Sequence, residues 1–389
     1  MALPAAPMTV ASHDALGQSG SDCPVLAPAE ATLLRQVLEA AVAHGASDVH
    51  VRAGAPPLLR VEGRLLPLDL PPLTADDATA LVLEAMTQEE DRAEYARDHE
   101  RDFAVTEPFV GRFRVNAYRM RGSDAMVLRH VRESVPSLEA LGVPAIARSL
   151  ALTPSGIVLV CGPTGSGKST TLAAMIDAIN DERYCHILTI EDPIEFLHAN
   201  RRATISQREL HTDTLEFARA LRAGLRQDPD VMVIGEIRDR ETLRTALQAA
   251  QTGHLVLASM HASSVIEVVH RIVDMFPADE HRQIRATLAE SLRGIICQHL
   301  VAGARADGRV LTCEIAVSTA RIRDAITDAE RTDQLHEILA EGEHYGMRTS
   351  EQDLVRLVLA GDITLSEAQT VTTRQSDLLV ALRRAGFRG

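Results

Sequence analysis

Residues 162–169 read GPTGSGKS, and this stretch decides the fold class of the 389-residue chain. A continuous apolar run, residues 157–161, precedes it, and apolar residues at helical spacing follow it over residues 170–179. A glycine-rich loop between a strand and a helix turns backbone N–H groups and the positive end of the helix dipole toward phosphate groups. The stretch and its flanks therefore predict a phosphate-binding loop (P-loop) in an α/β domain.

The residues of this loop have separate predicted tasks. Lys168 supplies a mobile cation for the phosphates, and the Ser169 hydroxyl is a ligand for an Mg²⁺ ion that bridges two of them. ATP and Mg²⁺ are therefore the expected cofactors. The predicted nucleotide-binding residues are Gly162, Pro163, Thr164, Gly165, Ser166, Gly167, Lys168, Ser169 and Thr170.

Two other apolar strands end in carboxylates. Phosphoryl transfer to water needs a group that orients the attacking water, in addition to the phosphate cradle and the metal. Glu191 lies in TIEDPIEF, residues 189–196, and Glu236 lies in DPDVMVIGEIRD, residues 228–239. Gly235 stands where a usual Walker B strand carries an Asp, so we expect a non-standard Mg²⁺ site. The alternative for either glutamate is a helix N-cap or a loop salt bridge.

Two histidines bracket a further apolar strand. They are His254 and His261 in TGHLVLASMHASS, residues 252–264. A lone histidine beside an apolar strand is more often a hydrogen-bonded core or edge residue than a catalyst. A pair beside the P-loop sheet favours sensing of the γ-phosphate or relay of its loss. No thiolates cluster nearby, so we do not expect zinc at this pair.

The residue pattern divides the chain into five segments. Residues 1–29 are rich in Ala, Pro, Ser and Gly, and predict a disordered leader. Residues 30–132 mix strand and helix patterns, which predicts a small α+β domain, and residues 133–144 form a linker. Continuous apolar strands between helices, over residues 145–318, predict a parallel sheet with helices on both faces. Residues 319–389 have a helical pattern.

Composition narrows the class of function. No stretch approaches the roughly 18 to 20 apolar residues of a membrane span, and the start lacks a signal-peptide pattern, so we expect a cytoplasmic protein. The 40 basic and 54 acidic residues give a formal charge of −14, and aromatics are only 3%, which counts against nucleic-acid binding. Five scattered cysteines without a CxxC pair favour reduced thiols over a disulfide framework or a zinc site.

The four motifs together resemble the secretion ATPases of type II secretion and type IV pili (the GspE/PulE family). GPTGSGKS, TIEDPIEF, the Asp-less IGEIRD, and TGH with MHASS are similar to that family's Walker A, Asp, Walker B and His boxes. Within the family, the chain is most similar to the PilT/PilU-type pilus retraction motors. The stretches that carry this likeness are ASDVHVRAGAPPLLRVEGRL (46–65), GRFRVNAY (111–118) and SQRELHTDT (206–214).

This resemblance implies a PAS-like N-terminal domain and a RecA-like ATPase domain, assembled as a homohexamer with ATP between the two domains. It also implies that Arg114 and Arg129 neutralise charge on the γ-phosphate, the alternative being a solvated strand face. Glu191 is then the favoured catalytic glutamate, and Glu236 supports Mg²⁺ and water together with Ser169. Which glutamate acts as the general base stays open at this point.

The resemblance further implies a motor that drives pilus retraction, and hence twitching motility, through an inner-membrane platform protein. The motor would associate with the inner membrane only peripherally. The tetracysteine insert of assembly-type members is missing, which favours the retraction branch. However, the retraction element AIRNLIRE has an altered counterpart, RIRDAITD, at residues 321–328. This leaves two alternatives: an accessory ATP-binding subunit that works with a paralogous motor, or a type II/type IV secretion ATPase.

Overall fold

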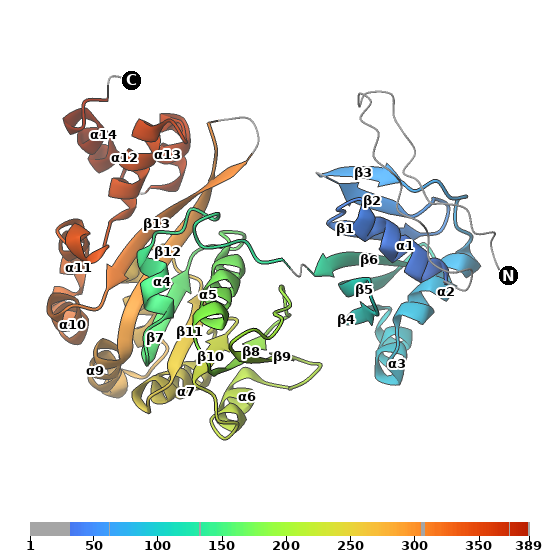
Figure 1. Cartoon of the computed structure of the whole chain (residues 1–389), viewed down its shortest axis with the longest axis horizontal. Coiled ribbons are helices and arrows are strands. Elements are labelled where there is room, and N and C mark those ends of the chain that lie inside the picture. The colour runs from blue at the N-terminus through green and yellow to red at the C-terminus, as the bar shows by residue number, and fades with distance from the viewer. Residues whose placement is uncertain (1–31, 62, 132–133, 305–307, 373, 388–389) are drawn as a thin grey trace. The chain divides into compact units, whose positions relative to one another are not determined.

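The structure is a computed structural model that describes residues 32–61, 63–131, 134–304, 308–372 and 374–387. The chain divides into two compact units, one up to residue 133 and one from Ser134 onward (Figure 1). The predicted leader, residues 1–29, lies outside the described residues. Within the described ranges, no helix has both the length and the apolar character that a membrane crossing requires.

The first unit is an antiparallel sheet with three helices. Its six strands run in the order β3-β2-β1-β6-β5-β4, and every neighbouring pair is antiparallel. The elements are α1 (Leu33–Ala43), β1 (Asp48–Arg52), β2 (Leu58–Val61), β3 (Arg64–Pro67), α2 (Ala75–Ala85), α3 (Glu89–Asp98), β4 (Glu100–Glu107), β5 (Gly111–Met120) and β6 (Ser123–Val131). The predicted α+β character is confirmed.

Residue alternation along the strands builds the core of this unit. In β5, Phe113, Val115 and Ala117 are buried, whereas Arg114 and Asn116 between them are exposed. Successive side chains of a strand point to opposite faces, so one face of the sheet is apolar and the other is polar. The apolar face packs with buried residues of α1 and α2 in a single cluster.

The second unit contains a seven-stranded sheet in the order β13-β12-β7-β11-β10-β8-β9. All neighbouring strands are parallel except β12 and β13. The strands are β7 (Gly156–Cys161), β8 (His186–Glu191), β9 (Thr204–Glu209), β10 (Val231–Ile234), β11 (Leu255–Met260), β12 (Leu292–Ala302) and β13 (Arg309–Val317). Continuous apolar runs reveal four inner strands, β7, β8, β10 and β11, but not the inner strand β12 or the edge strands β9 and β13, which interrupt their apolar residues with polar ones.

Helices cover both faces of this sheet (Figure 1). Along β7, Ile157 and Leu159 pack with helices α6 to α11, whereas Val158 and Val160 pack with α4 and α5. Helices α12 to α14 form a smaller cluster with the end of β12. The helices of this unit are α4 (Ile146–Ala151), α5 (Lys168–Glu182), α6 (Phe217–Gly224), α7 (Arg240–Gln251), α8 (Val265–Asp274), α9 (His281–Ser291), α10 (Ala320–Thr327), α11 (Leu335–Ala340), α12 (Ser350–Ala360), α13 (Leu365–Val371) and α14 (Gln375–Arg384).

The parallel inner strands bring separate sequence motifs to one edge of the sheet. The P-loop follows β7, Glu191 ends β8, Glu236 follows β10 and His261 follows β11. The carboxyl ends of parallel strands are where open α/β sheets bind their ligands. The predicted α/β domain with helices on both faces is confirmed, and this edge is where its site must be sought.

Two phenylalanines of the first unit test the core assignment. Phe113 is fully buried and Phe109 is fully exposed. We expect Phe113→Ala to lower the free energy of unfolding of this unit by about 3–5 kcal/mol, because it leaves a cavity. The matched control Phe109→Ala is expected to change it by less than about 0.5 kcal/mol. Hydrogen exchange of the β5 amides in increasing urea measures both effects, and equal losses would contradict the assignment.

Candidate active site

The shape of the P-loop depends on its glycines. Gly162, Gly165 and Gly167 have φ values of 149°, 79° and 88°, a region that favours glycine. A Cβ on Gly162 would lie 2.3 Å from the backbone oxygen of Gln298 and 2.4 Å from Ser166 Oγ. Any larger residue at Gly162 would therefore force the loop and its neighbouring strand apart.

Lys168 begins α5 and folds back onto the loop. Its Nζ donates to the backbone oxygens of Gly162, at 2.9 Å, and Pro163, at 3.0 Å. Burial lowers the pKa of Lys168, and the negative charge of Glu236 acts in the opposite direction. A phosphate oxygen carries negative charge and is therefore a stronger hydrogen-bond acceptor for Lys168 than either carbonyl oxygen. With the exposed Ser169 hydroxyl beside it, the loop suits a nucleotide triphosphate and its Mg²⁺ ion.

Gln298 of β12 supports the loop from within the protein. Its side chain is fully buried, and its Nε2 donates to the backbone oxygen of Ser166 at 2.7 Å. A Cβ on Gly167 would lie 3.3 Å from the same Nε2. Sequence reasoning missed Gln298 because β12 carries no motif and was not predicted as a strand.

Glu191 is half-buried at the end of β8 and accepts hydrogen bonds from neutral donors. Thr189 Oγ1 donates to its Oε1 at 2.7 Å, and Gln207 Nε2 donates to the same oxygen at 3.0 Å. Burial raises the pKa of Glu191, while these bonds favour the charged form and oppose that rise. A carboxylate with a raised pKa in a cavity is suited to accept a proton.

Glu236 is bonded to a histidine and an arginine instead. Its Oε1 lies 2.9 Å from His261 Nε2, and its Oε2 accepts a hydrogen bond from Arg238 Nε at 2.8 Å. Arg238 Nη1 in turn lies 3.5 Å from Asp192 Oδ2. Glu236 thus connects its own motif to that of His261, and Arg238 extends the connection to the motif of Asp192. Arg238 lies within the IGEIRD motif, but sequence reasoning assigned it no role.

These groups surround a single cavity of about 280 Å³. It lies between the P-loop, the start of α5 and the segments that follow β8, β10 and β11. Its lining includes Thr164, Gly165, Lys168, Ser169, Glu191, Asp192, Gly235, Glu236, Arg238, Ser259 and His261. Four of the nine predicted loop residues (Thr164, Gly165, Lys168 and Ser169), both glutamates and one histidine therefore line one cavity.

Close approach of two strands accounts for the missing Walker B Asp. A Cβ on Gly235 would lie 3.2 Å from Glu191 Cα and 3.3 Å from the backbone oxygen of Ile190. The backbone N–H of Gly235 donates to that same oxygen at 2.8 Å. Since both obstacles are backbone atoms, a side chain at this position would push β8 and β10 apart.

The structure separates the two predicted histidines. His254 precedes β11 and His261 follows it, so a six-residue strand of roughly 20 Å, at about 3.3 Å per residue, lies between them. His254 Nδ1 lies 3.1 Å from the backbone oxygen of Ala249, at the opposite edge of the sheet. The expectation that the pair senses the γ-phosphate is therefore corrected for His254, which lies away from the P-loop edge of its own chain, whereas His261 reaches that edge. Relay of the loss of the γ-phosphate stays a prediction.

The predicted arginines lie side by side in the first unit. Arg114 of β5 and Arg129 of β6 are directly opposite each other in the strand register, and both are exposed. Arg129 Nε donates to Oδ1 of the buried Asp48 at 2.8 Å, which orients it and offsets part of its charge. Their action on a phosphate stays a prediction.

The crowding at Gly235 can be tested by restoring the usual Walker B residue. We expect Gly235→Asp to lower the stability of the second unit by about 1–3 kcal/mol, because overpacking displaces backbone. Gly235→Ala introduces only the Cβ and is expected to show part of this loss. Thermal unfolding followed by circular dichroism measures it. An unchanged melting temperature for Gly235→Asp would show that the strands can separate freely.

Known proteins resemble this chain over most of its length. The type IV pilus retraction ATPase PilT of Pseudomonas aeruginosa is 42% identical over 336 residues, which are 86% of this chain and 97% of that protein. The type IV pilus ATPase PilU of the same species is 39% identical over 348 residues, 90% of this chain and 91% of that protein.

The fold is similar to a solved structure as well. The crystal structure of the pilus retraction motor PilT with bound ADP matches with a TM-score of 0.82 and 40% identity, over 90% of this chain and 99% of that chain. The family model described as type II/IV secretion system protein matches residues 26–370. The chain therefore belongs to the type II/IV secretion system protein family.

Proposed function

We propose that this protein is the ATP-hydrolysing motor of a type IV pilus system and that it drives pilus retraction. The observation that carries this proposal is the cavity in which Lys168 of the P-loop, Glu191, Glu236 and His261 meet. Relatives named as retraction and pilus ATPases support the pilus assignment. The reaction would convert ATP and water into ADP and phosphate.

Each side chain has a proposed part in this reaction. Lys168 and the P-loop bind the phosphates, while Ser169 and Glu236 would hold Mg²⁺, whose charge offsets that of the phosphates when it is bound. Glu191 accepts a proton from water as the new oxygen–phosphorus bond forms and the bond to ADP breaks. His261, bonded to Glu236, is placed to report the loss of the γ-phosphate.

We further propose a homohexamer that works on an inner-membrane platform protein and associates with the membrane peripherally. The likeness to the PilT retraction motor over 90% of this chain supports this assembly. A deletion in cells tests whether the motor retracts pili or assembles them. If the protein drives retraction, deletion of its gene will leave surface pili in excess, whereas loss of pili would mean assembly or secretion.

An accessory role is the second candidate, because the PilU relative also matches 90% of the chain. In that role the protein would bind ATP, turn it over little and act through a paralogous motor. The complete set of catalytic groups counts against it. Near-zero hydrolysis by a purified hexamer, restored only by adding the paralogous motor, would favour it.

The hydrolytic assignment is tested by separating nucleotide binding from turnover. Lys168 is the only lysine in the sequence, so an amine-acylating reagent can modify just this side chain and the N-terminus. We expect ATP with Mg²⁺ to slow acylation of Lys168 about tenfold or more, as measured by mass spectrometry. Glu191→Gln and Glu236→Gln should keep this protection and lose about 100-fold or more in turnover.

Lys168→Ala is expected to lose both binding and turnover, because the cation for the phosphates is absent. Full ATP hydrolysis by both Lys168→Ala and Glu236→Gln would contradict the assignment. Acylation of Lys168 that ATP does not slow would place the nucleotide elsewhere.

The turnover rate should depend on pH through Glu191. Burial and the neighbouring Glu195 carboxylate raise the pKa of Glu191 above the ordinary 4.5, against the hydrogen bonds from Thr189 and Gln207 and from the Glu195 backbone. A protonated Glu191 cannot accept a proton from water, so kcat falls as the pH drops through this raised pKa. A pH profile of kcat measures the effect. An acid limb at or below 4.5, or one that persists in Glu191→Gln, would assign the titration to another group.

A further inference from the structure

Gln207 lies on β9, within the SQRELHTDT stretch, and uses its whole side-chain amide. Its Nε2 donates to Glu191 Oε1 at 3.0 Å and to the backbone oxygen of Phe196 at 2.9 Å. Its Oε1 accepts from the backbone N–H of His198 at 2.9 Å. Rotation of the amide by half a turn would place donor against donor and acceptor against acceptor, so its orientation is determined.

This amide connects Glu191 to the segment that follows it in the chain. Pro193, Phe196 and His198 of that segment line the same cavity as Glu191. Burial lowers the pKa of His198 to about 4, so its ring is neutral near pH 7 and adds no positive charge beside the carboxylate. The placement of Glu191 therefore depends on a neutral hydrogen-bond network and not on an ion pair.

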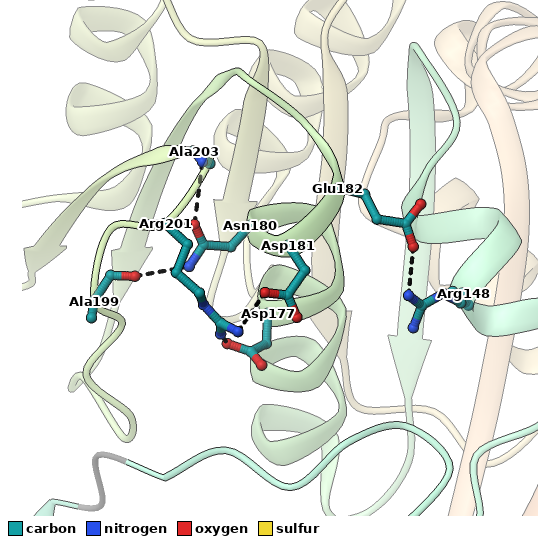
Figure 2. A network of polar contacts seen from close by, with 8 residues as sticks. All are labelled: Arg148, Asp177, Asn180, Asp181, Glu182, Ala199, Arg201 and Ala203. Atoms are coloured by element: carbon teal, nitrogen blue, oxygen red, sulfur yellow. Dashed lines mark hydrogen bonds and ion pairs between the residues drawn. The ribbon is translucent and has the colours of Figure 1, made fainter.

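The side-chain amide of Asn180 binds the next part of this segment, residues 199–203, but it makes no hydrogen bond to Glu191. Asn180 of α5 is fully buried, and its Nδ2 donates to the backbone oxygen of Ala199 at 2.8 Å. Its Oδ1 accepts from the backbone N–H groups of Arg201 and Ala203, at 3.0 Å and 3.3 Å (Figure 2). The Arg201 side chain also pairs with Asp177 and Asp181 of α5.

Each amide thus makes three hydrogen bonds: Asn180 makes all three to the segment after Glu191, whereas Gln207 makes two to that segment and one to Glu191 itself. Gln207 contacts the carboxylate of Glu191, and Asn180 contacts only backbone. We propose that Gln207 is a positioning residue for ATP hydrolysis, which holds the Glu191 carboxylate in its working orientation against the wall of the cavity. This inference rests on the proposed function, in which Glu191 accepts the proton from water.

Gln207→Met tests the proposal, since Met has a similar length and cannot donate or accept these bonds. We expect kcat to fall about 10- to 100-fold, as is usual when a group that orients a reacting side chain is removed. KM for ATP and the protection of Lys168 by ATP should change by less than about twofold. A partly unfolded preparation would also lower the apparent kcat without changing KM, but Lys168 in its unfolded fraction would lose the protection by ATP. Full protection of Lys168 therefore distinguishes a positioning role from loss of folding.

Asn180→Leu is the matched control, because it removes three bonds to the same segment and leaves Glu191 untouched. We expect both variants to lower the unfolding temperature, but only Gln207→Met to lower kcat more than about threefold. If Gln207→Met does not fold, Gln207→Asn keeps the amide and shortens its reach. The expected result for Gln207→Asn is a kcat at least about fivefold below that of the unaltered protein.

Three results would overturn the inference. They are an unchanged kcat in Gln207→Met or Gln207→Asn, and an equal loss of kcat in Asn180→Leu, which would assign the effect to the anchored segment as a whole. The turnover of Glu191→Gln distinguishes failure of this inference from failure of the proposed role of Glu191. If Glu191→Gln abolishes turnover and Gln207→Met does not alter it, only the role of Gln207 is lost. If Glu191→Gln keeps full turnover, the positioning role of Gln207 falls together with the proposed role of Glu191 as proton acceptor, while hydrolysis at the P-loop still stands.

Discussion

The parallel pairing of β7, β11, β10 and β8 is the constraint on which the site depends. In this register Met260 pairs with Cys161, and Ile234 pairs with both Ile190 and Ala258, so the four strands end within about two residues of one another. The P-loop, two glutamates and a histidine, far apart in the sequence, then leave the sheet at the same edge. A one-residue slip would turn a strand's side chains to the opposite face, and packing by helices on both sides resists it.

The same packing explains two departures from a simple P-loop site. β8 and β10 approach so closely that a side chain at Gly235 would have to displace backbone, and the first carboxylate after β10 is that of Glu236 one residue later. β12 approaches the P-loop closely enough for Gln298 to support it directly. Backbone proximity therefore restricts the residue at Gly235, next to β8, and the residue at Gly162, next to the backbone oxygen of Gln298.

The two glutamates differ in their surroundings. This difference bears on which of them is the general base, a question that the sequence left open. Glu191 is held by neutral donors and its pKa is raised, whereas Glu236 is bonded to His261 and Arg238. When the environments of two carboxylates differ in this way, their chemical roles differ as well. The arrangement favours Glu191 as the proton acceptor and Glu236 as the group that connects the metal side of the site to His261.

The sequence by itself determined the P-loop, four inner strands and the strand-end carboxylates, because these depend on local signals: glycines at set positions and uninterrupted apolar runs. Only the tertiary structure decided that His254 lies at the far edge of the sheet, and that Gln207 and Gln298 reach Glu191 and the P-loop. Those contacts join residues 16 and 132 positions apart, and they come from β9 and β12, two strands that mix polar with apolar residues. A local pattern carries no information about which distant strand will pair beside it.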